Sequence, residues 1–257
     1  MSLSIAAPTV TAGCTQCRDP KVLGFDFTMA FQPIMNLETD SPFAYEALVR
    51  GLNGEGAAEI LAKVNDDNRY LFDQACRTKA IELAANFRLH HIPGCHLSIN
   101  FLPNAVYRPE TCIRSTLTAC STFGFPSGLL MFEVTEGENI GDPTHLLKIF
   151  EDYSARGFLT AIDDFGAGYA GLNLLSMFQP GVLKIDMELT RDVDRHHVKR
   201  AIVEAIVMVS KQLHIQVIAE GIETEAERDT LYNMGIIYQQ GYLYARPMVG
   251  ALPLANL

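Results

Sequence analysis

Short apolar segments alternate with longer amphipathic segments along most of this chain. We interpret the apolar segments as strands: Leu97–Leu102, Leu130–Thr135, Leu159–Asp163, Val182–Asp186, Gln216–Glu220 and Ile237–Leu243. The stretches between them are compatible with helices, and in Val198–Leu213 the residues Ile202, Ile206 and Val209 fall on one face. Strands that alternate with helices in this way are typical of βα units, which build parallel sheets.

The first part of the chain departs from this alternation. Two strands, Phe31–Leu37 and Ala44–Arg50, are separated by the turn-prone residues 38–42, which is the spacing of a hairpin. Helical periodicity begins near Ala57 and continues to Phe87. Eight strands in all predict an α/β fold, namely a modified (β/α)8 barrel of the TIM type with an early antiparallel strand.

Composition adds limits to this picture. We assign residues 23–257 to the barrel, and residues 1–22, which lack periodicity, to a flexible N-terminal segment. A net charge of −10 argues against binding to a DNA or RNA duplex or to an anionic membrane. We find neither a membrane-spanning run nor a secretory signal, so we expect a cytoplasmic protein with reduced cysteines. Cys14 and Cys17 form a C-x-x-C pair, which is half of a zinc site at best.

Two adjacent acids, Asp163 and Asp164, follow an apolar strand and precede a glycine-rich loop. Neighbouring carboxylates repel each other and lose hydration on burial, so a bound cation would explain their position. The alternative is a helix N-cap, for which Asp is favoured. The run Gly166–Gly171 also fits the dinucleotide pattern G-x-G-x-x-G, but the acids before it would repel a pyrophosphate.

Polar side chains also stand at the ends of the other predicted strands. In a barrel these ends converge on one face, where active sites are found. Helix capping could account for Glu136, Asp186 or Glu223 individually. It does not explain four residues embedded in apolar sequence, which are Glu46, Asn100, Glu133 and Glu220. Their oxygen atoms are ligands that hard divalent cations prefer.

Such a set of ligands could hold two cations, which together can clamp a phosphodiester and activate water. One ion would be held by Glu46, Asn100, Glu133 and Asp163, and the other by Asp163 and Asp164. Lys184 would orient the attacking water, unless it forms a structural ion pair with Asp186. Arg50 offers a planar fork for a phosphate oxygen, unless it is simply a surface charge.

Several motifs together carry a family resemblance. The segment Glu46-Ala47-Leu48-Val49-Arg50 resembles the signature of EAL-domain cyclic-di-GMP phosphodiesterases. Further blocks agree with the same family: Phe31-Gln32-Pro33-Ile34, Ser98-Ile99-Asn100, Phe132-Glu133-Val134-Thr135-Glu136, Asp163-Asp164-Phe165-Gly166, Leu183-Lys184-Ile185-Asp186, Ala219-Glu220-Gly221-Ile222-Glu223-Thr224 and Gln240-Gly241-Tyr242-Leu243. The blocks occur in order over most of the chain, which makes the resemblance specific.

The resemblance implies hydrolysis of cyclic di-GMP to linear pGpG with two Mg2+ or Mn2+ ions, in a protein that often forms a homodimer. The implied metal ligands are Glu46, Asn100, Glu133, Asp163, Asp164 and Glu220. The residues implied in catalysis are Lys184, Glu220 and Glu46, and those implied in substrate binding are Gln32, Leu48, Arg50 and Gln240. Glu136 and Glu223 would hold the loop after Asp164, with Asp186 also in a supporting position.

One departure from the family concerns that loop. Ala170-Gly171 replaces the common Ser-Ser, which removes two hydroxyls that could cap the next helix. The chain has no cyclase-type Gly-Gly-Asp-Glu-Phe run and no obvious sensor domain, so regulation would come from the N-terminus, the dimer or a separate regulatory protein. Two alternatives stay open. One is a cyclic-di-GMP-binding or protein-interaction module with little turnover, and the other is an unrelated barrel enzyme that uses Lys184 as a base or Schiff-base nucleophile.

Overall fold

The computed structural model describes residues 23–137, 143–168 and 171–255. The strands are β1 (Thr28–Asn36), β2 (Ser41–Arg50), β3 (His96–Asn100), β4 (Leu130–Thr135), β5 (Leu159–Phe165), β6 (Val182–Ile185), β7 (Gln216–Ala219), β8 (Tyr238–Gln239) and β9 (Met248–Val249). The helices are α1 (Ala57–Leu61), α2 (Arg69–Asn86), α3 (Pro109–Phe123), α4 (Pro143–Ala155), α5 (Gly171–Met177), α6 (Met187–Thr190), α7 (His197–Gln212) and α8 (Glu225–Asn233). The predicted N-terminal segment, with Cys14 and Cys17, lies outside the described residues, and so does Ala170.

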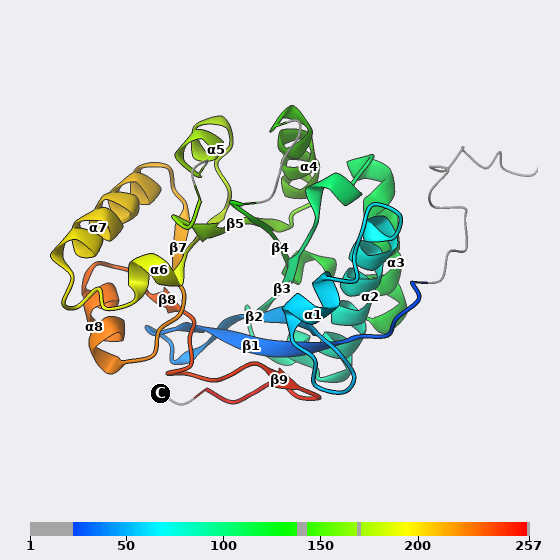
Figure 1. The fold of residues 1–257 in the computed structure, drawn as a ribbon, viewed down its shortest axis with the longest axis horizontal. Helices are drawn as coiled ribbons and strands as arrows, with labels where there is room; N and C mark the ends of the chain where they lie inside the picture. Colours follow the sequence, from blue (N-terminus) through cyan, green and yellow to red (C-terminus); the bar gives the residue numbers. More distant parts are fainter. Residues whose placement is uncertain (1–22, 138–142, 169–170, 256–257) are drawn as a thin grey trace, which may run out of the picture.

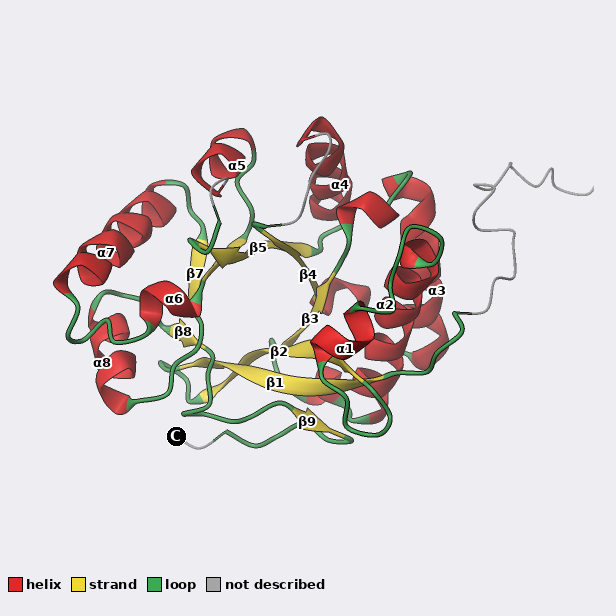
Figure 2. Cartoon of the chain, in the orientation of Figure 1, coloured by secondary structure: helices red, strands yellow, loops and turns green. Residues whose placement is uncertain are grey.

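The strands close into a barrel with the helices around its outside, which confirms the predicted fold (Figure 1). Strands β2 to β8 pair in parallel in chain order, whereas β1 is antiparallel to β2 and β8 and so closes the ring (Figure 2). The pairing of β1 with β8 covers only Met35 and Asn36. Farther along β1, Ala30 and Phe31 pair with β9, a strand that the hydrophobic pattern did not predict.

Two predicted elements differ from the structure. The last strand was expected over Ile237–Leu243 but β8 contains two residues, because the backbone beyond it turns and bonds to Ile222 in the loop after β7. The helical run expected from Ala57 is two helices, α1 and α2. The break contains Asn65 and Asn68, whose side chains accept hydrogen bonds from nearby backbone amides and so compete with helix formation.

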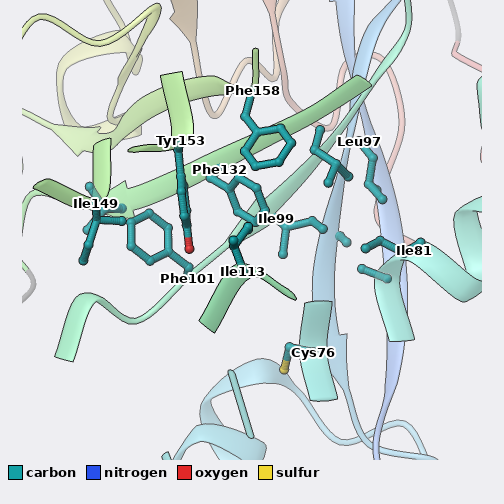
Figure 3. Packing of buried hydrophobic residues seen from close by; sticks show 14 of the residues in the cluster. Cys76, Ile81, Leu97, Ile99, Phe101, Ile113, Phe132, Ile149, Tyr153 and Phe158 are labelled. Atoms are coloured by element: carbon teal, nitrogen blue, oxygen red, sulfur yellow. The ribbon is translucent and has the colours of Figure 1, made fainter. Parts of the chain in front are cut away.

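Apolar residues form two layers around the strands. The largest cluster lies between the strands and helices α2, α3 and α4, where Ile99, Phe132 and Tyr153 are buried (Figure 3). A second layer fills the barrel itself with one residue from most strands: Ile34, Ala44, Met131, Ala161, Val182 and Ile218. None of the helices in the described ranges is both long enough and apolar enough to span a membrane.

Candidate metal and phosphodiester site

A layer of polar residues lies directly above the apolar layer inside the barrel. Side chains two positions apart on a strand point to the same face, and each polar residue stands two positions from its strand's interior residue. Glu133, for example, follows Met131 on β4, and Asp163 follows Ala161 on β5. The polar layer comprises Gln32, Glu46, Asn100, Glu133, Asp163, Lys184, Glu220 and Gln240. The structure therefore brings together residues that the sequence places far apart.

Lys184 lies at the centre of this layer and is fully buried. Its Nζ lies close to four carboxylate oxygens: 2.8 Å from Oε1 of Glu220, 2.9 Å from Oδ1 of Asp163, 2.9 Å from Oε2 of Glu133 and 3.5 Å from Oε2 of Glu46. The alternative ion pair of Lys184 with Asp186 is not found among the described residues. Instead, Asp186 caps helix α6 and accepts a hydrogen bond of 2.8 Å from the amide of Glu188.

One ammonium does not balance this much negative charge. Burial raises the pKa of Glu133 to about 8, and although Lys184 opposes the shift, Glu46 and Asp163 add to it. Burial, together with the charge of Asp163, raises the pKa of Asp164 to about 6. Burial alone would lower the pKa of Lys184, but the surrounding carboxylates raise it well above its ordinary value. In this environment an additional cation would favour the ionised carboxylates.

The carboxylates form two groups suited to metal ions. Oxygens of Glu46, Glu133 and Asp163 lie within 4.8 Å of one another, and so do oxygens of Asp163, Asp164 and Glu220. Asp163 belongs to both groups, which is the arrangement of a bridging ligand. Within the described part of the chain, the buried Oε1 of Glu133 receives no hydrogen bond, which leaves it available to a cation. A set of oxygen donors of this kind fits Mg2+ or Mn2+.

Hydrogen bonds from amides hold the first of these groups. Asn100 at the end of β3 donates from Nδ2 to Oε1 of Glu46 over 3.0 Å. Gln240 donates from Nε2 to Oε2 of Glu46 over 2.8 Å and to Oε1 of Gln32 over 3.2 Å. Gln32 in turn donates to the carbonyl of Ala245 over 3.1 Å. Both oxygens of Glu46 are thereby fixed before any ligand binds.

The loop after β5 carries Asp164 in a left-handed conformation, with φ of +53°. Such a conformation is uncommon for a residue other than glycine and needs support from its surroundings. Glu136 provides it by accepting hydrogen bonds of 2.7 Å from the amides of Gly166 and Gly171. Gly171 begins helix α5, so the Glu136 carboxylate bonds to the N-terminus of that helix. The hydroxyls of the Ser-Ser pair common in the family could have capped the same N-terminus.

Two further acids lie near this region. Glu223 forms an ion pair of 2.7 Å with Arg191, and its role toward the loop after Asp164 stays a prediction. Glu227, which sequence reasoning missed, accepts hydrogen bonds from the amides of Asp192, Glu223 and Thr224. It thereby ties the loop after β7 to the segment after α6. The spacing Thr224-x-x-Glu227 is a capping box, which could have identified this residue.

Two cavities of about 430 and 230 Å³ meet at the acidic residues and share Glu46, Leu48, Asp164 and Glu220 in their walls. The larger cavity is mainly apolar, and its walls include Met29, Leu61 and Phe72. The smaller cavity is lined by more polar groups, among them Gln32, Arg191, Gln240 and Tyr242. The apolar cavity could not be predicted from the sequence, because its wall residues Met29, Leu61 and Phe72 come from β1, α1 and α2.

Arg50 stands outside the lining of both cavities. It lies at the end of β2, and its guanidinium donates from Nη1 to the carbonyl of Val49 over 2.7 Å. Its contact with a phosphate stays a prediction. Leu48, two positions earlier on the same strand, contributes to the walls of both cavities.

Comparison with solved structures identifies relatives with this architecture. A standalone EAL protein from Vibrio cholerae O395, solved in a c-di-GMP-bound form, is 51% identical with a TM-score of 0.87, and the match covers 91% of this chain and 98% of that one. The manganese and cyclic-diGMP complex of Klebsiella pneumoniae BlrP1 at pH 6 is 34% identical with a TM-score of 0.83, covering 90% of this chain and 58% of that one.

Sequence comparison gives relatives that are named for more than one activity. The bifunctional diguanylate cyclase/cyclic di-GMP phosphodiesterase MucR of Pseudomonas aeruginosa is 39% identical over 78% of this chain and 28% of its own length. The blue light- and temperature-regulated antirepressor BluF of Escherichia coli is 31% identical over 87% of this chain and 55% of its own length. This chain thus spans between about a quarter and half of these two relatives. The EAL domain family matches residues 22–247, and the chain belongs to this family.

Proposed function

We propose that this protein is a metal-dependent phosphodiesterase that hydrolyses cyclic di-GMP to linear pGpG. The observation that carries the proposal is the position of Asp163, which is shared by two groups of carboxylates facing the cavities. The solved relatives with c-di-GMP bound support the choice of substrate. The acidity of the site agrees with this function only if cations offset it, because a bare carboxylate cluster would repel a phosphodiester.

Glu46, Asn100, Glu133 and Asp163 would hold one Mg2+ or Mn2+ ion, and Asp163, Asp164 and Glu220 would hold the other. Two such ions supply Lewis acidity, a deprotonated water and charge neutralisation for in-line displacement at phosphorus. In the reaction the water oxygen bonds to phosphorus, the bond to one ribose oxygen breaks, and that oxygen gains a proton.

The side chains of the polar layer have definite tasks in this scheme. The three N–H donors of Lys184 are directed at the carboxylates of Glu133, Asp163 and Glu220. Cations bound to these carboxylates would free an N–H of the ammonium to hold the attacking water. Gln240 donates hydrogen bonds to both Glu46 and Gln32, and both glutamines line the smaller cavity, where one end of the substrate would lie. The apolar walls of the larger cavity would exclude water from the other end, beside Leu48.

A chromatographic assay tests this proposal. Purified protein is incubated with cyclic di-GMP and Mn2+ or Mg2+, with and without a chelator, and the products are separated. We expect conversion to pGpG that stops with the chelator and in the variant Glu46→Ala. Glu151→Ala, on the exposed face of α4, is the matched control and should retain full turnover. Turnover by the Glu46→Ala variant, or in the chelator, would contradict the assigned role.

A second candidate is a cyclic-di-GMP-binding or protein-interaction module with little turnover. The relationship to BluF, which is named as an antirepressor, favours it. Binding of cyclic di-GMP in saturating Mn2+, without formation of pGpG over many hours, would select this alternative. The third alternative, a Schiff-base enzyme, is disfavoured because Lys184 is held as an ammonium by its four carboxylate neighbours.

We also propose that the protein works as a cytoplasmic homodimer, regulated through the dimer or by a separate protein. Large apolar side chains are exposed on two neighbouring helices of the barrel's outer layer. They are Leu172 and Met177 on α5, and Val198, Ile202 and Met208 on α7. Burial of such side chains against a second copy would remove apolar surface from water. Sedimentation equilibrium should give twice the mass of the chain, and a monomer at all concentrations would contradict a dimer.

A further inference from the structure

A buried ion pair lies behind the polar layer, within the cluster that separates the barrel from helices α2 and α4. Arg77 on α2 is fully buried, and its Nε lies 2.9 Å from Oδ2 of Asp73, one turn earlier on the same helix. Arg77 also donates from Nη1 to the hydroxyl of Tyr153 on α4 over 2.7 Å. Because an unpaired charge in such a place is strongly unfavourable, the three side chains depend on one another.

Aromatic rings surround the guanidinium of Arg77. Its Cζ lies 5.2 Å from the ring centre of Phe132, 5.5 Å from that of Phe101 and 5.8 Å from that of Tyr153. At these distances the ring faces attract a cation. The rings also contact one another, with centres 4.8 Å apart for Phe132 and Tyr153, and Figure 3 shows the three gathered in the core. We refer to Asp73, Arg77, Phe101, Phe132 and Tyr153 as the arginine cage.

The cage contacts the strand ends that carry two of the candidate metal ligands. Phe101 immediately follows Asn100, and Phe132 immediately precedes Glu133. Because neighbouring side chains on a strand point to opposite faces, the rings face the helices while the ligands face the barrel interior. The cage therefore fixes the back of the same backbone that presents Asn100 and Glu133.

Asp73 adds a direct bond to this backbone. Its Oδ1 accepts a hydrogen bond of 2.9 Å from the amide of Leu102, two residues beyond Asn100. Asp73 is also part of the wall of the larger cavity. Asp73 thus holds the guanidinium of Arg77 through Oδ2 and the backbone just beyond β3 through Oδ1.

We propose that Asp73 and Arg77 are positioning residues that hold Asn100 and Glu133 in the geometry required by one of the two metal ions. The inference rests on the proposed function, because it assumes that the carboxylates bind a divalent cation. The ligands repel one another, so they keep their spacing without metal only if the strands behind them cannot move. Changing the cage should therefore weaken metal binding even though no cage residue contacts the ion.

Calorimetric titration of the full chain with Mn2+, well below the unfolding temperature, tests this inference. Loss of a group that supports metal ligands weakens metal binding about 10- to 100-fold, and we expect Asp73→Asn to weaken one of the two binding events by this amount. Arg77→Lys keeps the charge but loses the planar fork, and we expect a smaller loss in the same event. Should Asp73→Asn fail to fold, Arg77→Lys decides the question alone.

Two control variants separate positioning from general stability. Asp152→Asn on α4 breaks an ion pair with Arg156, which has the same four-residue spacing but is partly exposed. Ile81→Ala removes buried apolar volume from α2 and replaces no residue of the cage. Both should bind Mn2+ within twofold of the unmodified chain, although Ile81→Ala should unfold at a lower temperature.

The outcomes are distinguishable. Unchanged Mn2+ binding by the cage variants, or equal weakening by Ile81→Ala, would overturn the positioning role. If the unmodified chain itself bound no Mn2+, the proposed function would fail instead.

Discussion

Replacing Lys184 by methionine is the perturbation whose effect follows most directly from the structure. The ammonium lies within 3.5 Å of four carboxylates and is completely buried. Methionine has a similar length and no charge, so the variant leaves the carboxylates without their cation while changing the packing little. In metal-free protein these groups must then either repel one another or take up protons.

The size of the effect can be estimated from related cases. Removing one partner of a buried ion pair costs about 3–5 kcal/mol. For proteins of about this size, each kcal/mol lowers Tm by roughly 2–4 °C. We therefore expect Tm of the metal-free Lys184→Met variant to fall by about 6–20 °C.

Differential scanning calorimetry measures Tm of the variant and of the unmodified chain, first in chelator and then in excess Mn2+. A ligand present at about one hundred times its Kd stabilises the folded state by about 2.7 kcal/mol. We expect the variant to gain more from Mn2+ than the unmodified chain, because the cation restores positive charge that the variant lacks. An unchanged Tm in chelator, or an equal gain from Mn2+ in both proteins, would refute this account of the site.

Two further predictions concern the loop and the pH. Glu136→Ala removes two hydrogen bonds from the loop that carries Asp164. Turnover in the product assay should therefore fall at least tenfold, while circular dichroism shows that the chain stays folded. Full turnover would show that the loop needs no such support. The raised pKa values of Glu133, about 8, and Asp164, about 6, mean that the folded state binds more protons than the unfolded one. Metal-free protein should therefore lose stability as the pH rises from about 4 to 8. Saturating Mn2+ should reduce that loss of stability. Calorimetry at several pH values measures Tm, and a rise in Tm of the metal-free protein over this interval would contradict the direction of the pKa shifts.

The sequence was informative about the site because the strands could be recognised. Asp163 ends one predicted strand and Glu133 is embedded in another. Strand-helix alternation predicts that the carboxyl ends of such strands meet. The structure adds a second reason why the acids meet. Each acid stands two positions after an apolar residue that fills the barrel, so the side chains of both point into the barrel. The sequence offered two partners for Lys184, water or Asp186, and it could not choose because the four carboxylates that surround the ammonium come from distant parts of the chain.

Other features could not be predicted from local patterns. Strand β9 contains two exposed residues, which are too few to form a hydrophobic pattern. It pairs with Ala30 and Phe31 of β1, on the part of that strand's edge that β8 does not cover. Arg77 looks like an exposed residue on an amphipathic helix. Its burial depends on an acid one turn away and on the rings of Phe101 just after β3, Phe132 on β4 and Tyr153 on α4. The break near Asn65 depends on side-chain hydrogen bonds that compete with a helix of otherwise suitable periodicity.

The central claim is that two divalent cations share Asp163. Crystals of the full chain grown with Mn2+ and measured at the manganese absorption edge would locate the ions by anomalous scattering. We predict two anomalous peaks, one among Glu46, Glu133 and Asp163 and the other among Asp163, Asp164 and Glu220. Density for manganese elsewhere, or none at this layer of the barrel under conditions that support turnover, would contradict it.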